Sequence, residues 1–264
     1  MSTLKRPHSA APGTRPGDRN RSLERGIALL RAFKPGADLL GNGELAERTG
    51  LSRATVSRLA QTLVDSGMLE HDRRRRAYRL AAPVLSLAHA MRSGSPVLQL
   101  ASPWMRIEAE QRRINVGLAV ADGDEMVYLE SVRYSRRVAW RNVVAGQRVP
   151  MELTSLGRAW LSAAPHDART ALMAKFRERR AAGWRNLSLE INTAIASVHR
   201  LGYCWASWQP QVVALATPVA VADHPIYTLN MSVTGDTGAQ EIVDRLSGPL
   251  LALGRRLTEA IGNL

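Results

Sequence analysis

The segment from Gly43 to Leu80, GELAERTGLSRATVSRLAQTLVDSGMLEHDRRRRAYRL, constrains the fold of this chain more than any other. It contains two short amphipathic stretches separated by Gly50, a residue that easily adopts the positive φ of a tight interhelical turn. Two short apolar runs with a basic loop between them follow directly, as in a β-hairpin. The order of these pieces predicts a helix-turn-helix with a two-stranded wing, an architecture that places one helix in the major groove of DNA.

The second of these helices is expected to begin after Ser52, whose hydroxyl can cap its first turn. Its apolar residues recur at helical spacing and are expected to face a core. The opposite face holds no acid and combines Arg and Gln, which hydrogen-bond to base edges, with Ser and Thr, which suit phosphates or bases. A merely solvated face is the competing interpretation, and the adjacent turn and wing favour DNA. The DNA-contacting residues predicted here are Ser52, Arg53, Thr55, Ser57, Arg58 and Gln61.

The wing is predicted from strands at 68–71 and 77–80, with Tyr78 and Leu80 directed inward. Four consecutive arginines form the tip between them. So many like charges repel one another unless an anion lies nearby, and the backbone of double-stranded DNA supplies phosphates. A solvated charge run is the alternative. The tip residues are Arg73, Arg74, Arg75 and Arg76.

The charge of the chain also indicates a polyanionic partner. The 264 residues carry a formal charge of +13 and have a pI near 11.1. Up to Ala81, sixteen basic and eight acidic residues leave a net +8, so most of the excess lies in the first third. An arginine-rich coding bias is the alternative source of part of this charge.

Two features predict a cytoplasmic location. The one cysteine, Cys204, excludes an internal disulfide framework and argues against a cysteine-ligated metal site. Residues 1–21 are polar and rich in Pro, Gly and Arg, without the apolar core of a signal peptide or membrane anchor. We therefore expect a disordered basic arm at 1–21 and no membrane partner.

The remaining pattern predicts helices and strands in alternation. A first helix at 22–33 is expected to be capped by Ser22 and to pack through Leu23, Ile27, Leu30 and Phe33, with a loop at 34–42. Asp122-Gly123-Asp124 marks a hairpin turn. The mixture predicts an α+β fold with a central sheet. Further helices are expected at 83–94, 97–113, 154–164, 167–182, 186–201 and 239–261, with late strands at YCWASW, VVALATPVAV and IYTLNMSVTG.

Several motifs together resemble the IclR family of bacterial transcriptional regulators, in order and spacing, over nearly the whole chain from Ser22. The N-terminal motifs are typical of winged helix-turn-helix regulators, and the later ones single out this family. The resemblance implies an effector-binding domain with a GAF-like fold and a central antiparallel sheet, a homodimer or dimer of dimers, and a palindromic operator near a catabolic promoter. The motifs are SLERGIALLRAF, ELAERTGLSRATVSRLAQTLVDSGMLE, YRLAAPVLSLA, VGLAVADGDEMVYLESV, TSLGRAWLSA, Gly202-Tyr203, ATPVAV and LNMSVTG.

The resemblance also implies a domain order and an effector site. It places a winged helix-turn-helix at 22–81, a linker helix at 82–96 and an effector-binding and oligomerisation domain at 97–264. In the family the ligand lies over the sheet, beneath the segment LTSLGRAW and against alternate residues of the strand LNMSVTG. Packing or helix capping is the alternative role for each residue. The implied effector contacts are Leu156, Gly157, Asn230, Ser232 and Thr234.

The stretch CWASWQPQVVALATPV departs from the family pattern. Many relatives have an acidic run, a Pro-Gly pair and often a cysteine there, whereas this chain has no carboxylate, Gln211 in place of the glycine and Ala214 in place of the cysteine. Trp205 and Trp208 have entered the region. We therefore expect an apolar pocket that favours a small aromatic or otherwise unsaturated acid, held by Ser232, Thr234 and Asn230 and walled by Trp205 or Trp208. Filling a core or a dimer interface is their alternative role.

Two other function classes are less consistent with the sequence. An enzyme is not indicated, because the only glycine-rich match is the short Gly41-Asn42-Gly43, and the six histidines are scattered without metal-ligand spacing. A non-specific DNA-coating protein would need no large sheet domain. We therefore expect a sequence-specific, ligand-responsive transcriptional regulator with a small-molecule effector, and no catalytic residue, metal or cofactor.

Overall fold

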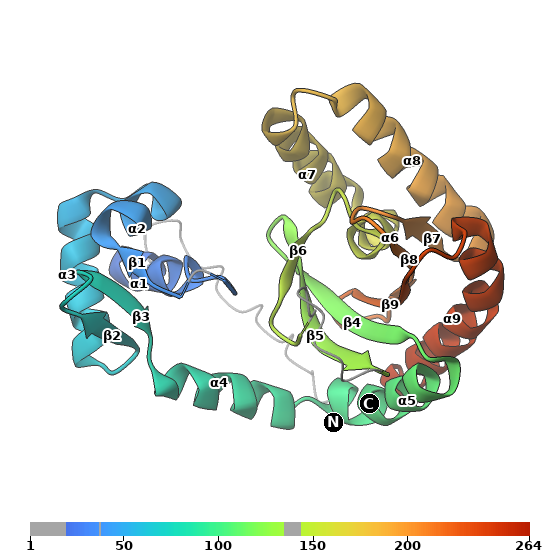
Figure 1. Cartoon of the computed structure of the whole chain (residues 1–264), viewed down its shortest axis with the longest axis horizontal. Coiled ribbons are helices and arrows are strands. Elements are labelled where there is room, and N and C mark those ends of the chain that lie inside the picture. Colours follow the sequence, from blue (N-terminus) through green and yellow to red (C-terminus); the bar gives the residue numbers. More distant parts are fainter. Residues whose placement is uncertain (1–19, 37, 135–143) are drawn as a thin grey trace, which may run out of the picture. The chain divides into compact units, whose positions relative to one another are not determined.

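A computed structural model describes residues 20–36, 38–134 and 144–264 of the chain. The chain divides into two compact units between Leu87 and Ala88, and each is described by itself (Figure 1). Almost all of the basic arm expected at 1–21 lies outside the described residues, and the domain boundaries expected from the sequence stay predictions. Among the helices in the described ranges, none combines the length and the apolar composition of a membrane span.

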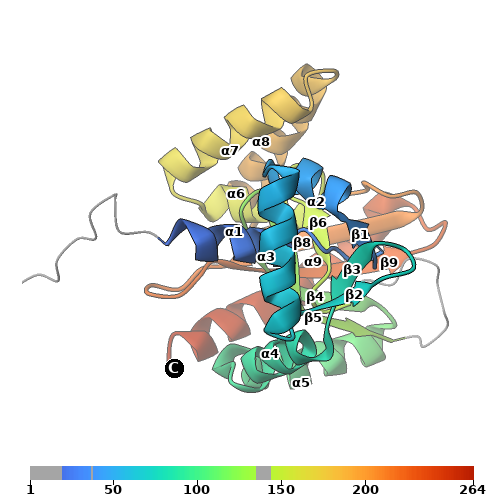
Figure 2. The same ribbon diagram turned by 90° about the vertical axis from the view of Figure 1, so that its left-hand side faces the viewer.

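The first unit is a helical domain with a small antiparallel sheet, in the strand order β1-β3-β2. Helix α2, the turn at Gly50 and α3 follow one another, and the β2–β3 hairpin lies beside α3 (Figure 2). This arrangement confirms the predicted helix-turn-helix and wing. The elements are α1 (Arg21–Arg31), β1 (Leu40–Gly41), α2 (Asn42–Thr49), α3 (Arg53–Asp65), β2 (Leu69–Asp72) and β3 (Ala77–Leu80).

Helix α1 differs from the prediction at its start and on its buried face. The cap lies two residues earlier than expected, because Asn20 caps the helix instead of Ser22. The Asn20 side-chain oxygen accepts hydrogen bonds from the backbone N–H groups of Ser22 and Leu23, each at 3.1 Å. Leu29 is fully buried, whereas Leu23 and Ile27 are 61% and 47% exposed, because the helix packs on the core through its last turns.

Two details of the small sheet also correct the prediction. The expected loop at 34–42 contains β1, in which Leu40 pairs with Tyr78 of β3 and joins the core. Tyr78 is buried as predicted, but Leu80 is 39% exposed. Leu80 is the last residue of β3 and, unlike Tyr78, does not belong to the core cluster of this unit.

The second unit is built on an antiparallel six-stranded sheet in the order β6-β5-β4-β9-β8-β7. The β4–β5 hairpin turns at Gly123 and Asp124 as predicted, with φ of +65° at Gly123. Strand β6 is only three residues long and carries no clear pattern, so the sequence does not predict it. The strands are β4 (Asn115–Asp122), β5 (Glu125–Arg133), β6 (Arg148–Pro150), β7 (Cys204–Ala206), β8 (Val212–Val219) and β9 (Tyr227–Thr234).

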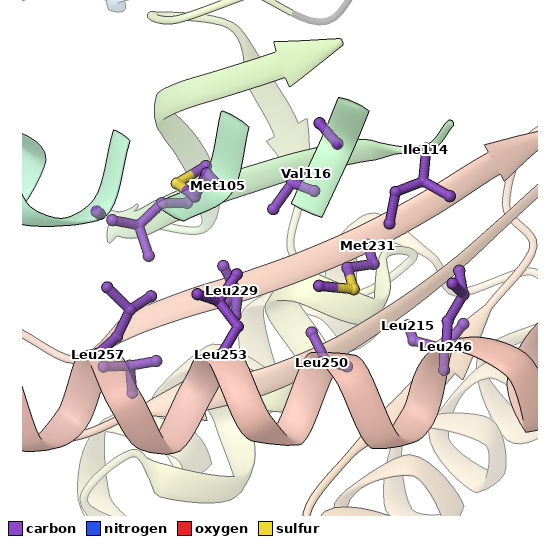
Figure 3. Close-up of a cluster of buried hydrophobic side chains, with 14 of the residues drawn as sticks. Met105, Ile114, Val116, Leu215, Leu229, Met231, Leu246, Leu250, Leu253 and Leu257 are labelled. Atoms are coloured by element: carbon purple, nitrogen blue, oxygen red, sulfur yellow. The ribbon is translucent and has the colours of Figure 1, made fainter. Parts of the chain in front are cut away.

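Helices cover both faces of this sheet. On one face, here called the α9 side, Leu250, Leu253 and Leu257 of α9 pack against Leu229 and Met231 of β9 (Figure 3). On the other face, the α6 side, α6 lies on the strands, and α7 and α8 contribute Phe176 and Ile191 to a second core. The fold is therefore α+β with a central antiparallel sheet, as predicted. The helices are α4 (Ala82–Ser93), α5 (Pro96–Arg112), α6 (Ser155–Ala163), α7 (His166–Arg179), α8 (Trp184–Leu201) and α9 (Ala239–Ile261).

Candidate DNA interface and effector cavity

The first turn of α3 is built from short polar side chains, as the sequence predicts. Gly50 takes a φ of +69° in the turn before it. The Ser52 hydroxyl accepts a hydrogen bond from the backbone N–H of Thr55 at 3.3 Å, and the two side-chain oxygens lie 2.9 Å apart. Val56 and Ala60 are fully buried on the opposite face. The core therefore sets the rotation of α3 and determines which residues face outward.

The outward face of α3 is exposed at Arg53, Ser57, Arg58 and Gln61. It is not free of acid, because Gln61 Nε2 donates to Asp65 Oδ1 at 2.8 Å, one turn further along. This hydrogen bond corrects the expectation of an acid-free face and engages Gln61 within the helix. The guanidinium groups of Arg53 and Arg58 have no hydrogen bond or ion pair among the described residues. These two arginines are therefore the side chains of α3 most available for base edges.

The wing tip is held together by Asp72. Its carboxylate accepts a hydrogen bond from the backbone N–H of Arg75 at 3.0 Å and one from Arg79 Nη2 at 3.3 Å. The backbone hydrogen bond from Arg75 and the nearby guanidinium charges lower the pKa of Asp72. Arg76 closes the loop with a φ of +52°. Residues 73–76 are all exposed, so the tip presents four arginines on a closed turn.

A small polar cavity lies on the α6 side of the second unit's sheet, where β4, β5 and β9 meet. Its volume is about 30 Å³, room for a water molecule or two but not for an organic acid. One cationic side chain, a phenol and several amide or hydroxyl groups converge on it. These polar residues are Asn115, Tyr128, Ser131, Arg133, Asn230 and Ser232.

Gly117 creates the space in which the cavity residues meet. A Cβ at this position would lie 2.4 Å from both Asn230 Oδ1 and Tyr128 Cε1. Asn230 Oδ1 is buried and has no hydrogen-bond partner among the described residues. Burial raises the pKa of the Tyr128 hydroxyl, and a hydrogen bond with the Asn230 side chain lowers it by less. The hydroxyl therefore stays protonated. Because an unsatisfied buried acceptor is costly, the cavity suits a polar ligand or water.

The three residues predicted on β9 share one face of their strand, as a period of two requires. Asn230 and Ser232 line the cavity, and Thr234 stands exposed at the end of the strand. Ala214, in the place of the family cysteine, pairs with Ser232 and therefore lies on the same face. The sequence thus predicted that these positions lie together, while their contact with a ligand stays a prediction.

Leu156 and Gly157 lie at the start of α6, on the same side of the sheet. Thr154 caps this helix, with its Oγ1 accepting from the backbone N–H of Gly157 at 3.3 Å. Leu156 is 1% exposed and belongs to the core. A Cβ on Gly157 would lie 2.1 Å from the backbone oxygen of Met151. Both residues therefore have packing roles, and the ligand contacts implied for them stay predictions.

The two tryptophans are not brought together with the cavity residues. Trp205 pairs with Leu215, which belongs to the core on the α9 side, and direct cross-strand partners point to the same face. Trp208 lies beyond the end of β7. For Trp205, this placement corrects the expectation that Trp205 or Trp208 walls a pocket with Asn230, Ser232 and Thr234, because the alternation of β7 turns Trp205 to the opposite side of the sheet. The role of Trp208 stays a prediction.

Sequence reasoning missed the cavity residues of β5, because a β-bulge interrupts the alternation. Leu118 pairs with Glu130 and Ala119 with Tyr128, so Leu129 has no partner on β4. On β5, even-numbered residues such as Tyr128 face the cavity before the bulge, and odd-numbered residues face it after the bulge. Ser131 and Arg133 therefore line the cavity. No residue in this stretch signals a bulge.

Gln211 has a backbone conformation that favours glycine. It adopts a φ of +61°, a left-handed conformation that costs a non-glycine residue roughly 1 to 3 kcal/mol. Its Nε2 donates to Asp236 Oδ1 at 2.9 Å, which holds the loop between β7 and β8 against the end of β9. A side-chain contact therefore accompanies this left-handed residue.

The described residues show no group of three or more His, Cys, Asp or Glu side chains that could hold a metal ion. Cys204 is buried, and its Sγ lies 3.5 Å from the backbone oxygen of Ser155. Burial raises the pKa of this thiol to about 12, so it remains neutral. Cys204 is therefore a packing residue in this structure.

Models of two protein families match the chain. The IclR helix-turn-helix domain matches residues 22–73, and the model described as bacterial transcriptional regulator IclR C-terminal matches residues 89–258. A crystal structure of an IclR family transcriptional regulator from Brucella abortus is 30% identical, with a TM-score of 0.85 over 96% of each chain.

Two curated relatives are regulators by name. The HTH-type transcriptional regulator TsaQ1/TsaQ2 of Comamonas testosteroni is 33% identical over 69% of this chain and 66% of its own length. The p-hydroxybenzoate hydroxylase transcriptional activator of Acinetobacter baylyi is 28% identical over 94% of this chain and 93% of its own. The similarity to the second relative thus extends over both units.

Proposed function

Because this chain belongs to the IclR family of bacterial transcriptional regulators, we propose that it binds a specific operator through α3 and the wing and responds to a small-molecule effector. The observation that carries DNA reading is the pair of exposed guanidinium groups on α3, Arg53 and Arg58, beside a wing tip of four arginines. Arginine recognises guanine bidentately in the major groove, and phosphates attract the wing. Ser52, Thr55, Ser57 and Gln61 complete the proposed surface, and no enzymatic role is proposed.

Arg58→Ala is expected to relax operator specificity. Removing one bidentate hydrogen-bonded pair with a base should cost about 1 to 3 kcal/mol of discrimination at one base pair. The measurement compares affinities for an operator selected from random DNA and for its scrambled version. Arg25→Ala, an equal charge change at an exposed position of α1, is the control and should preserve the ratio. An unchanged ratio in Arg58→Ala would show that Arg58 does not read bases.

We propose that the chain acts as a homodimer or dimer of dimers on a palindromic site. Helix α4 supports this assembly, because none of its residues is buried and its large apolar side chains face solvent. Leu85, Leu87 and Met91 are 74%, 59% and 53% exposed. Apolar surface gathered on one helix is typical of a contact between proteins. Light scattering from the full chain distinguishes monomer, dimer and tetramer.

We propose that the effector is a small organic acid, aromatic in character, bound at the cavity. Arg133 supplies a cation for a carboxylate, and Asn230 and Ser232 supply hydrogen-bonding groups beside it. The name of the Acinetobacter relative, an activator for p-hydroxybenzoate hydroxylase, supports an aromatic acid. The cavity is far smaller than such a molecule. The sheet and the segments that cover its α6 side therefore have to move apart when the effector binds.

Asn230→Ala is expected to weaken binding of 4-hydroxybenzoate, the probe chosen for this site. The free Oδ1 of Asn230 is an acceptor, so its partner on the probe is the phenolic hydroxyl. A neutral hydrogen bond contributes about 0.5 to 1.5 kcal/mol, so the dissociation constant should rise about two- to twelvefold in calorimetric titration. Trp205→Phe is the matched control, because Trp205 lies on the α9 side, and its affinity should stay within about twofold of wild type. A larger loss in Trp205→Phe than in Asn230→Ala would contradict the cavity assignment.

A further inference from the structure

The C-terminal turn of α4 is fastened to β5 by a cluster of hydrogen bonds inside the second unit. Arg92 donates through Nη1 to the backbone oxygen of Leu129, and through Nη2 to Glu130 Oε2 at 2.9 Å. Ser102 of α5 donates to the same carboxylate oxygen at 3.1 Å. We call these four residues, Arg92, Ser102, Leu129 and Glu130, the α4–β5 latch.

The latch sits at the β-bulge that also forms the cavity. Leu129 is the residue without a partner on β4, and its carbonyl oxygen is the one that Arg92 binds. Glu130 pairs with Leu118 and therefore faces the α9 side, towards α5. The next residues along, Ser131 and Arg133, alternate onto the cavity side. The bulge thus places a latch on one face of the sheet and cavity residues on the other, within five consecutive residues.

This geometry links the cavity to the end of α4 mechanically. A bulge disrupts the ladder locally, so β5 is held less firmly to β4 at Leu129 than elsewhere along the strand. The backbone N–H of Ser131 also donates to Glu130 Oε1 at 2.9 Å, which joins the first cavity residue after the bulge directly to the latch carboxylate. A ligand that draws Ser131 and Arg133 into new contacts therefore pulls on the carboxylate and the carbonyl that hold Arg92.

We propose that the α4–β5 latch couples occupancy of the cavity to α4, the helix that runs from the second unit into the first, with Arg92 and Glu130 as positioning residues. The inference rests on the proposed function, because it takes the cavity as the effector site. A ligand can shift an equilibrium only through a difference in its interactions with two states, and the latch supplies such a difference, closed or released. The rival role is a static brace for α4.

A first experiment needs no ligand. Arg92→Ala in the full chain should raise amide hydrogen exchange at residues 131–133 of β5, about tenfold, as well as in the last turn of α4. The side chains of Arg92 and Glu130 are 36% and 16% exposed, and a pair of this kind adds little to global stability, so the variant should fold. Arg112→Ala is the matched control, because it removes an ion pair to Glu108 within α5. Unchanged exchange at 131–133 in Arg92→Ala overturns the latch.

A second experiment separates coupling from binding, with 4-hydroxybenzoate as the probe. Saturating probe should change the operator affinity of the wild type at least about fivefold, the lower range of measured couplings. In Arg92→Ala the change should fall below about twofold, while the affinity for the probe without DNA stays within about threefold of wild type. Arg92→Lys keeps the charge but not the forked donors, so it should recover only part of the response.

The outcomes distinguish the two proposals. Equal responses in wild type and Arg92→Ala overturn the latch and leave the effector site intact. Failure of the wild type to bind 4-hydroxybenzoate counts against the proposed effector, and the hydrogen-exchange result then decides the latch by itself. A response lost together with probe affinity would assign Arg92 to the support of the site and would also overturn the coupling role.

Discussion

Neutralising the wing tip is expected to flatten the salt dependence of operator binding. In this variant Arg73, Arg74 and Arg75 become Gln, and Arg76 becomes Asn, which tolerates the left-handed conformation found there. Each phosphate that the protein no longer neutralises lowers the slope of log K against log salt by about 0.9, so four phosphates lower it by about 3.6. Affinity at physiological salt should fall by roughly two to three orders of magnitude for all sequences alike.

The control for this experiment removes the same charge from the second unit. Substituting Arg177, Arg185, Arg200 and Arg245 by Ala gives an equal change at exposed positions that have no ion pair among the described residues. This control tests whether net charge alone weakens binding, and its slope should stay near that of wild type. A wing variant that keeps the wild-type slope, or that loses discrimination between operators more than affinity, would show that the tip does not act on phosphates.

Gly157→Ala is expected to destabilise the second unit whether or not an effector is present. The new Cβ would lie 2.1 Å from the Met151 backbone oxygen and 2.4 Å from its Cα, so α6 or the preceding loop has to shift. Overpacking of this kind costs about 1 to 3 kcal/mol, or more where backbone must move. For a unit of this size each kcal/mol lowers the melting temperature by about 2 to 4 °C, which thermal unfolding followed by circular dichroism measures.

Gly26→Ala supplies the comparison, because a Cβ at Gly26 in α1 meets nothing within 4 Å. Replacing glycine by alanine inside a helix should stabilise it by about 0.5 to 1 kcal/mol. Opposite signs for the two substitutions would establish that steric contact, not helix propensity, dominates at Gly157. If Gly157→Ala melts like wild type and binds the effector poorly, the ligand contact implied by family resemblance would be favoured over packing.

Prediction from the sequence was most accurate where one short segment contains all the residues that determine the local structure. The turn at Gly50, the cap at Ser52 and the buried face of α3 follow from nearest-neighbour sterics and helical periodicity, and the structure confirms all three. The same holds for the Gly123-Asp124 hairpin turn and for the shared face of Asn230 and Ser232. Errors arose at element ends, such as the cap of α1, where a shift of two residues changes which side chain reaches the free N–H groups.

By itself, then, the sequence determined the class of the protein: a winged helix-turn-helix joined to an α+β domain, with its basic surface placed on α3 and the wing tip. Only the tertiary structure decided which effector-domain residues meet. Trp205 and Asn230 lie on opposite faces of the sheet because of the register in which β7 pairs with β8. Arg133 faces the cavity because of the β-bulge at Leu129. Side-chain direction in a sheet depends on register, and register is set by the pairing of one strand with its neighbour and by bulges, which the pattern within a single strand does not encode.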